Sequence, residues 1–348
     1  MQEPVALGRI GHSSMGETSP RQNVLRTLLE VFQWLSLAET MTQAGLVCRD
    51  WLQAAKSQEL WICYYHRTFG SQPQGSSSAL GQFEAVMRQR RLICLVSKAD
   101  VKFVHVETQE TRCVFMPEIQ RCRYASWLTL PLGDVLLCGG VLVPSKTYLS
   151  SVFRLPYMSG TSLSLPSMLS TRAGAGLCLH KSVLYVFGGD NPHNLASSEC
   201  YPFHSSRWEQ LPDMFIPRRS FTPALYKEDI YLAGGGGSLR TIEVFHIALM
   251  DYDALPVALP YVDSLTCSLV VGTRLVILTR QKMLSWDIGG TEDLQEIGTV
   301  PGLFWFSPAG VTATASNSYI SPYYDNAIYV LDHRSLSLAK VFGSPSSP

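Results

Sequence analysis

Residues 172–214 read RAGAGLCLHKSVLYVFGGDNPHNLASSECYPFHSSRWEQLPDM, and this stretch decides the fold. It holds four short apolar runs, at 176–179, 183–187, 199–203 and 207–211, each bounded by turn residues. Runs of this length are too short for helices with a buried face, so they predict strands. Their tight connections favour antiparallel neighbours. A four-stranded antiparallel unit of about 45 residues is one blade of a β-propeller.

The unit recurs along the chain. Gly188-Gly189 closes an apolar run in this stretch, and Gly139-Gly140 and Gly234-Gly235 do the same upstream and downstream. A glycine pair lets the backbone turn steeply at a place where a Cβ would clash. Trp208, near the end of its copy, can cover the joint between two blades. An arginine opens each of the three copies: Arg123, Arg172 and Arg219.

This pattern of a leading Arg, a Gly-Gly pair and a later Trp resembles the kelch repeat. The resemblance implies an all-β propeller with kelch-like blades. Strand patterns from Leu92 to Phe342 give five four-stranded units and one three-stranded opening unit, so we expect six blades over residues 92–343. Five or seven blades are the alternatives. The opening unit shows no recognisable innermost strand, and Gly343–Pro348 is too polar to supply it.

Composition narrows the function classes. Charged residues make up 16% of the chain and apolar residues 46%, which suits a large buried core. Lys plus Arg equals Asp plus Glu at 28 each, so no net charge attracts nucleic acid or an acidic membrane. The nine cysteines include no C-x-x-C pair and indicate buried reduced thiols. With no signal peptide or membrane span in view, we expect a cytoplasmic or nuclear protein.

The N-terminal quarter has a different pattern. Residues 1–20 predict a disordered tail, and residues 71–91 a Pro/Gly/Ser linker followed by a short helix. Between them, residues 21–70 predict three short helices with aromatic anchors. The blocks Val31–Leu35, Val47-Cys48-Arg49-Asp50-Trp51 and Leu60-Trp61 resemble an F-box, although Asn23-Val24 stands where that family has Leu-Pro.

The resemblance implies that this all-α module docks the adaptor Skp1 and, through it, a cullin ubiquitin ligase. The module has more apolar residues than so small a unit can bury, which indicates a binding site for a partner. Burial in the module's own core is the alternative for each aromatic residue. The residues expected to bind Skp1 are Val24, Leu28, Phe32, Leu35, Val47 and Trp51.

No constellation for catalysis emerges. The eight His residues form no H-x-x-x-H or H-E-x-x-H pattern, and no G-x-S-x-G or phosphate-binding G-x-x-x-x-G-K is present. Some kelch propellers are enzymes that hold copper or iron. The iron-binding enzymes use an E-x-x-x-D-x-x-x-H pattern. Glu209 and Asp213 match its first two positions, but Pro217 stands where His is required. We therefore expect no metal, no cofactor and no enzyme activity.

Recognition is the remaining role, because loops on a rigid scaffold are where binding residues concentrate. In kelch domains the leading Arg and the loop after Gly-Gly share one face. Arg and Tyr are favoured at interfaces, and converging Arg suits an acidic or phosphorylated peptide. Pairing of each Arg with local carboxylates and carbonyls is the structural alternative. The residues expected to bind the substrate are Arg123, Arg172, Arg219, Arg240, Tyr148, Asn191, His193, Arg280 and Tyr323.

The sequence thus predicts a non-catalytic substrate receptor of an SCF (Skp1–cullin–F-box) ubiquitin ligase. The F-box-like module would recruit Skp1, and the propeller would bind the protein to be ubiquitinated. The alternative is a propeller scaffold without ligase function, and an oxidoreductase propeller is a third, which would need a metal.

Overall fold

The computed structural model describes the chain from Leu92 onward, as residues 92–96, 100–105, 111–117, 120–130, 134–155, 162–203, 205–236, 240–260, 265–300, 310–313, 316–322 and 327–342. The chain divides into two compact units, Met1–Ala85 and Val86–Pro348, and all described residues belong to the second. The predicted tail, F-box-like module and linker, with the six residues assigned to Skp1, lie outside the described residues.

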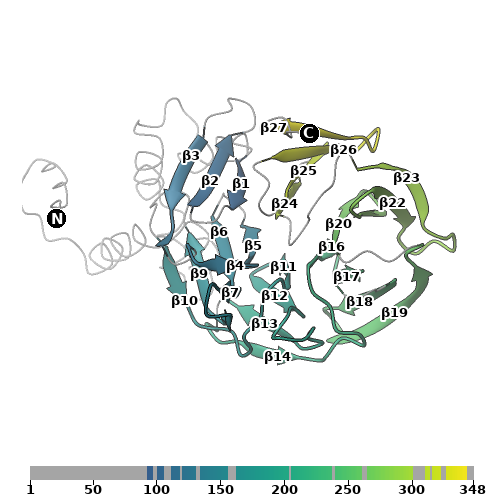
Figure 1. Ribbon diagram of the computed structural model, residues 1–348. Helices are drawn as coiled ribbons and strands as arrows, with labels where there is room; N and C mark the ends of the chain where they lie inside the picture. The colour runs from purple at the N-terminus through teal and green to yellow at the C-terminus, as the bar shows by residue number, and fades with distance from the viewer. Residues whose placement is uncertain are drawn as a thin grey trace, which may run out of the picture. The chain divides into compact units, whose positions relative to one another are not determined.

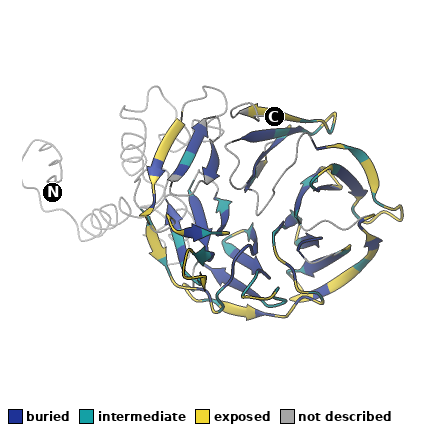
Figure 2. Ribbon diagram, in the orientation of Figure 1, coloured by how far each residue is buried: buried dark blue, intermediate teal, exposed yellow. Residues whose placement is uncertain are grey.

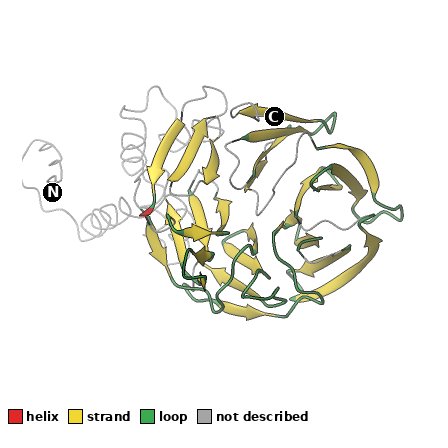
Figure 3. Cartoon of the chain, viewed as in Figure 1, coloured by secondary structure: helices red, strands yellow, loops and turns green. Residues whose placement is uncertain are grey.

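The described residues form strands and loops, apart from the helical residue Pro117 (Figure 3). Six sheets are the blades, A to F, named here in chain order. Blade A contains β1 (Leu92–Val96), β2 (Asp100–His105) and β3 (Thr111–Phe115). Blade B contains β5 (Ser126–Thr129), β6 (Val135–Cys138), β9 (Val152–Leu155) and β10 (Leu163–Leu165). Blade C contains β11 (Gly176–His180), β12 (Val183–Phe187), β13 (Ser198–Pro202) and β14 (Glu209–Leu211).

Blade D contains β16 (Ala224–Tyr226), β17 (Asp229–Ala233), β18 (Thr241–His246) and β19 (Asp251–Ala258). Blade E contains β20 (Thr266–Val271), β21 (Arg274–Leu278), β22 (Lys282–Asp287) and β23 (Gln295–Thr299), and β15 (Phe221–Thr222) adds to it in parallel. Blade F contains β24 (Gly310–Ala313), β25 (Asn317–Ser321), β26 (Ile328–Asp332) and β27 (Leu338–Phe342). A small sheet pairs β4 (Cys122–Arg123), β7 (Val141–Leu142) and β8 (Thr147–Tyr148).

Burial explains why these segments are strands. The second strand of each four-stranded blade is almost wholly buried, as in β12, whose residues after Val183 are all buried. Such a strand packs against a neighbouring blade on both faces. Its sequence is therefore a continuous apolar run, without alternation of apolar and polar residues. The outermost strands alternate or are largely exposed, as in β19 (Figure 2). The sequence prediction of six blades agrees with the six blade sheets in the described residues.

The blades follow one another around a central axis, and the last meets the first (Figure 1). Ile93, Leu95 and Val104 of blade A pack against Tyr319 and Ile328 of blade F. Among the described residues, blade A has three strands, and its burial pattern matches the second, third and fourth strands of the others. The predicted lack of an innermost strand in blade A therefore agrees with the described strands.

Trp127 closes the ring at this position. Its indole, on the innermost strand of blade B, lies against Gly310 on the innermost strand of blade F, and a Cβ at residue 310 would lie 2.0 Å from the ring. Ser321 Oγ also donates a hydrogen bond of 3.0 Å to the carbonyl oxygen of Cys94. These contacts join blades F, A and B. The central cavity, of about 430 Å³, is lined by described residues of blades B to F.

None of the described residues forms a helix with the length and apolar character needed to cross a membrane.

Candidate functional site

The three Gly-Gly pairs lie at the same place in successive blades, directly after the second strands β6, β12 and β17. In an antiparallel blade the loop after the second strand and the segment leading to the next blade emerge on the same side. We call this side the Gly-Gly face. Its described loops are residues 116–117, 120–125, 139–151, 166–175, 188–197, 212–223, 234–236, 240, 259–260, 265, 279–281, 300, 322 and 327.

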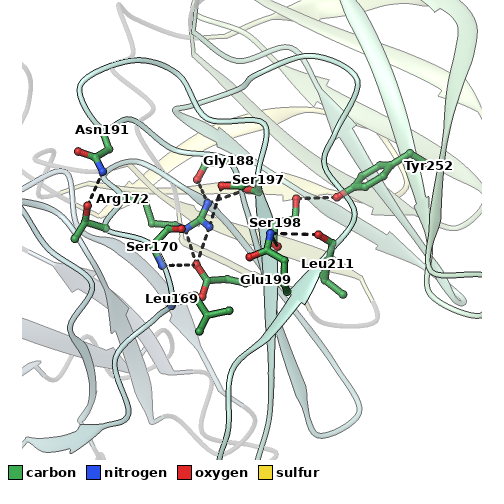
Figure 4. Close-up of polar contacts among 12 residues, drawn as sticks. Leu169, Ser170, Arg172, Gly188, Asn191, Ser197, Ser198, Glu199, Leu211 and Tyr252 are labelled. Carbon is green, nitrogen blue, oxygen red and sulfur yellow. Dashed lines mark hydrogen bonds and ion pairs between the residues drawn. The ribbon is translucent and has the colours of Figure 1, made fainter.

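Arg172 is buried beneath this face, with 1% of its surface exposed. Its guanidinium forms an ion pair with Glu199 at 2.7 Å, and Nη1 donates to the carbonyl oxygens of Gly188 at 2.6 Å and Ser197 at 2.9 Å (Figure 4). The other oxygen of Glu199 accepts the backbone N–H of Leu169 at 2.6 Å. The pair therefore ties the loop before blade C to two strands inside it.

Arg218 repeats this arrangement in blade D. Its guanidinium lies 2.7 Å from Glu243 and donates to the carbonyl oxygens of Gly234 and Thr241. The second oxygen of Glu243 accepts the backbone N–H of Phe215 at 2.8 Å. Burial lowers the pKa of Arg218 and the charge of Glu243 opposes that effect. Each charge is thus buried with its counter-charge and with hydrogen bonds, the condition under which buried ions are tolerated.

The backbone of each arginine also joins two blades. The carbonyl oxygen of Arg172 accepts the N–H of Gly140 in blade B, and that of Arg218 accepts the N–H of Gly189 in blade C, both at 2.8 Å. At the first glycine of the pair the chain comes closer still. A Cβ at Gly188, where φ is +59°, would lie 2.3 Å from the carbonyl oxygen of Arg218. This close approach explains why the sequence pattern has glycine at this position.

The structure corrects the register of the leading arginines. Arg172 matches Arg218 and not Arg219, and the same place in blade B holds Cys122, not Arg123. Cys122 Sγ donates to the carbonyl oxygen of Gly139 at 3.5 Å, as the two arginines donate to Gly188 and Gly234. Arg123 and Arg219 follow one position later, beside the loops.

Arg172 consequently does not line the surface on which the sequence analysis places it. Its donors are directed to Glu199, Gly188 and Ser197, and it is the structural arginine that the sequence analysis gave as the alternative. Glu199 and Glu243 stand 27 and 25 residues after their arginines, as the hydrogen bonds between them record. A Glu at similar offsets of 27 and 25 residues in two copies is the signal that sequence reasoning missed.

Two of the other predicted residues, Tyr148 and Arg219, meet at Asp190 on the Gly-Gly face. Asp190 Oδ2 accepts hydrogen bonds from Arg219 at 2.8 Å and from the Tyr148 hydroxyl at 3.2 Å. Tyr148 belongs to the loop of blade B, Asp190 to that of blade C, and Arg219 to the segment that enters blade D. Burial and the charge of Asp190 raise the pKa of Tyr148, which therefore stays a neutral donor. The cluster fixes three successive loops relative to one another.

Beside this cluster lies a shallow recess of about 570 Å³ between the loops of blades C and D. His193, which is exposed, lines it, and Asn194 contributes an amide that donates to the carbonyl oxygen of Gly236 at 2.8 Å. Asn191 lies next to the recess, and its amide donates to Thr171 Oγ1 at 2.5 Å. His193 and Arg219 are thus the two predicted binding residues that line the recess with exposed side chains.

The remaining predicted residues are spread around the ring. Arg240 in blade D is exposed, and its Nε donates to the carbonyl oxygen of Leu259 at 2.6 Å. Arg123 in blade B and Arg280 in blade E are both half-buried. Tyr323 lies outside the described residues. The structure therefore brings together Tyr148, Arg219 and His193, with Asn191 adjacent.

Sequence reasoning also missed the most exposed apolar side chains among the described loops of this face. Leu169 is 56% exposed, Phe215 61% and Tyr124 51%. Leu169 and Phe215 occupy equivalent positions in consecutive blades, each held by a buried glutamate. Tyr124 has a positive φ of 56°, a conformation that is uncommon for an aromatic residue, and Gly174 holds the matching place in the next blade. Nothing in the local sequence marks these residues as exposed.

The described side chains of this face include hydrogen-bond donors and apolar groups suited to binding. The described residues contain no group of three or more His, Cys, Asp or Glu side chains placed to hold a metal. Burial raises the pKa of Cys94, Cys138, Cys178 and Cys267 to about 12, so these thiols are protonated and unreactive near neutral pH.

Comparison with known proteins supports the repeat assignment. Residues 171–215 match the family model of the Kelch motif, which covers blade C. The chain is similar to the Kelch repeat and BTB domain-containing protein 2 of three viruses. Identity is 22% over 223 residues for cowpox virus (strain Brighton Red), 24% over 174 for ectromelia virus (strain Moscow) and 27% over 135 for horsepox virus. These matches cover 59%, 47% and 35% of this chain. They cover 38%, 30% and 24% of the relatives, so the chain spans less than half the length of each.

Proposed function

We propose that this chain is the substrate receptor of an SCF (Skp1–cullin–F-box) ubiquitin ligase. Residues 21–70 dock Skp1, and the Gly-Gly face of the propeller binds the protein to be ubiquitinated. The chain carries out no chemistry itself. It holds a lysine of its substrate near an activated conjugate, so its contribution is proximity.

The observation that carries the receptor role is the cluster of Tyr148, Asp190 and Arg219. Three loops from consecutive blades are fixed to one another by hydrogen bonds, so the surface is rigid before a partner arrives. A preorganised surface loses less entropy on binding than a mobile one does. The kelch match over residues 171–215 agrees with this role, because kelch-type propellers present their loops for binding.

The ligase role rests on the block Val47-Cys48-Arg49-Asp50-Trp51 with Leu60-Trp61, which resembles an F-box. The viral relatives, by their names, combine kelch repeats with a second kind of domain, a BTB domain. A propeller joined to another module is therefore an arrangement that these relatives share with the one proposed here. In this chain the proposed second module is F-box-like.

Co-purification tests the ligase role directly. The full-length chain should recover Skp1, and Trp51→Ala and Leu35→Ala should each abolish recovery because they remove apolar contacts of the docking helix surface. Arg219→Ala, which lies on the propeller, should recover Skp1 as well as the unaltered chain does. Intact chain that recovers no Skp1 would contradict the proposal and would leave a binding scaffold without ligase function.

A further inference from the structure

The described loops of the Gly-Gly face are basic, although the chain as a whole has no net charge. Besides the two buried arginines, the described loops of this face hold six basic residues and two acidic ones. The basic residues are Arg121, Arg123, Lys146, Arg219, Arg240 and Arg280, and the acidic residues are Asp190 and Asp213. Asp190 is already occupied by Arg219 and Tyr148.

The opposite face shows no such excess. Its described turns join the first strand to the second and the third strand to the fourth within each blade. They hold four basic and four acidic residues, namely Lys181, Arg207, Lys227, Arg334, Asp134, Glu228, Glu292 and Asp293. Among the described residues the basic excess is thus confined to the Gly-Gly face, and it favours an acidic partner there.

Arg219 is the best placed of these charges. Its side chain is 45% exposed at the wall of the recess, and Asp190 holds Nη1 at 2.8 Å. That contact fixes the plane of the guanidinium while leaving part of it at the surface. A guanidinium with a fixed orientation suits a carboxylate, which it can bind with two parallel hydrogen bonds.

The same face also presents apolar side chains on a rigid backbone. Glu199 and Glu243 fix the backbone N–H groups of Leu169 and Phe215, and the carbonyl oxygen of Tyr124 accepts the N–H of Gly174 at 2.8 Å. The ring of Phe215 rests against buried Tyr252 with centroids 6.4 Å apart. Large apolar groups that are exposed yet held in place are typical of residues that dominate protein interfaces.

We infer that the Gly-Gly face over blades B to D takes a protein segment that is acidic and carries large apolar side chains. Its carboxylates face Arg219 and Arg240, and its apolar side chains contact Tyr124, Leu169 and Phe215. This inference rests on the proposed receptor role and adds the chemical class of the substrate. A nucleic acid could stack bases on Tyr124 and Phe215 but would gain little from Leu169, and the chain has no net positive charge, so we favour a protein.

Peptide display on the full-length chain tests the class without a known substrate. A random-peptide library should yield sequences enriched in Asp and Glu together with Phe, Leu, Trp or Tyr. Two selected peptides, made with a fluorescent label, then give Kd values by anisotropy. Replacing the peptide's carboxylates by amides should weaken binding at least about tenfold, and phosphoserine in their place shows whether phosphate substitutes. A single-stranded oligonucleotide serves as the polyanion comparison.

Matched variants test whether the peptides bind to the Gly-Gly face. Arg219→Glu with Arg240→Glu should weaken peptide binding at least about tenfold, whereas Lys181→Glu with Arg207→Glu, the same change of charge on the opposite face, should stay within about threefold. Phe215→Ser should weaken binding, and Leu249→Ser, at an exposed turn between β18 and β19, should not.

Neutral or basic selected peptides, an empty selection, equal effects of the two charge variants, or tighter binding of the oligonucleotide would each overturn the inference. Recovery of Skp1 by the same full-length preparations is measured in a separate experiment. A chain that recovers Skp1 but selects neutral peptides keeps the proposed function and loses the substrate class. A chain that selects acidic peptides without Skp1 shows the reverse.

Discussion

Blades B and C build the same joint from different chemistry. In blade C, Arg172 and Glu199 form a buried ion pair, and Arg172 donates to the carbonyl oxygen of Gly188 at 2.6 Å. In blade B, Cys122 takes the place of the arginine and donates weakly to Gly139 at 3.5 Å. Phe153 takes the place of the glutamate, because it pairs with Leu137 as Glu199 pairs with Val186.

Both polar partners are therefore replaced together, and neither is replaced alone. Removing one partner of a buried pair leaves an uncompensated charge, whereas replacing both by apolar groups can be nearly neutral. The comparison teaches that the Gly-Gly turn is the part that blades B, C and D share. The side chains that support the turn are either a full ion pair, or a weakly donating thiol beside an apolar side chain.

The largest expected effect comes from breaking the ion pair in blade C. Arg172→Ala or Glu199→Ala should lower the free energy of unfolding by about 3–5 kcal/mol, because either change leaves a buried charge without its partner. Urea denaturation of the full-length chain, followed by tryptophan fluorescence, measures this loss. Lys181→Ala, which breaks an exposed pair with Glu228, is the control and should change little. Equal losses for the two variants would contradict the structural role of Arg172.

A second effect separates backbone strain from steric conflict at the Gly-Gly turn. Gly188→Ala should lose about 2–4 kcal/mol, since alanine there meets both a positive φ and the carbonyl oxygen of Arg218. Gly272 has a similar φ of +63° with no atom within 4 Å of a Cβ, so Gly272→Ala should lose only about 1 kcal/mol. Thermal unfolding of the two variants measures the difference. Similar losses would show that conformation alone requires the glycine.

A third experiment copies blade B into blade C. The double variant Arg172→Cys/Glu199→Phe should lose about 1–3 kcal/mol, less than either single substitution, because no buried charge is left unpaired. The loss is not zero, since the N–H of Leu169 no longer has its acceptor. A double-substitution cycle by urea denaturation measures the coupling. Additive losses would show that the two residues act independently.

The smallest expected effect is a pH dependence of the stability of blade D, at His246 and Asp229. Nδ1 of His246 lies 2.7 Å from Asp229 Oδ1, and hydrogen bonding to Asp229 raises the pKa of His246. The folded state thus favours the charged imidazole. This stabilisation is fully present below the unfolded pKa of about 6.5 and is lost as the pH rises through the folded pKa.

His246→Gln should therefore remove a part of the pH dependence worth less than about 1 kcal/mol, as expected for a partly exposed pair. The measurement is the unfolding midpoint at about pH 5.5 and about pH 8.5, on either side of the reference pKa. His193→Gln, on the Gly-Gly face, is the control. An unchanged pH dependence in His246→Gln would exclude the ion pair as its source.

Much of the propeller could be predicted from the sequence. The glycine pairs and the short apolar runs of 172–214 locate the strands of blade C, because turn chemistry and burial are local properties. Trp208 was expected to cover a joint, and its Nε1 donates to the carbonyl oxygen of Pro166, in the segment that follows blade B, at 2.8 Å. The three strands that the described residues give blade A also agree with the pattern.

The candidate site was harder to predict. Two consecutive arginines, Arg218 and Arg219, have opposite fates, one buried with Glu243 and the other at the surface with Asp190. One residue of register decides between them, and it is set by the hydrogen bond from Gly189 to the carbonyl oxygen of Arg218. Partners that lie in another blade leave no local mark in the sequence. The clustering of Tyr148, Asp190 and Arg219 therefore emerged only from the structure.

The bond between Ser321 and Cys94 has a consequence for biosynthesis. It spans 227 residues, and the two strands that it links are made near the beginning and the end of the propeller. At a translation rate of about 5–20 residues per second, β1 leaves the ribosome roughly 10–50 seconds before its neighbour in blade F exists. During that interval the apolar side chains of Ile93 and Leu95 lack their partners Tyr319 and Ile328. The opening blade thus waits longest for its last neighbour, and a chain stalled before residue 317 would lack the strand that pairs Ser321 with Cys94.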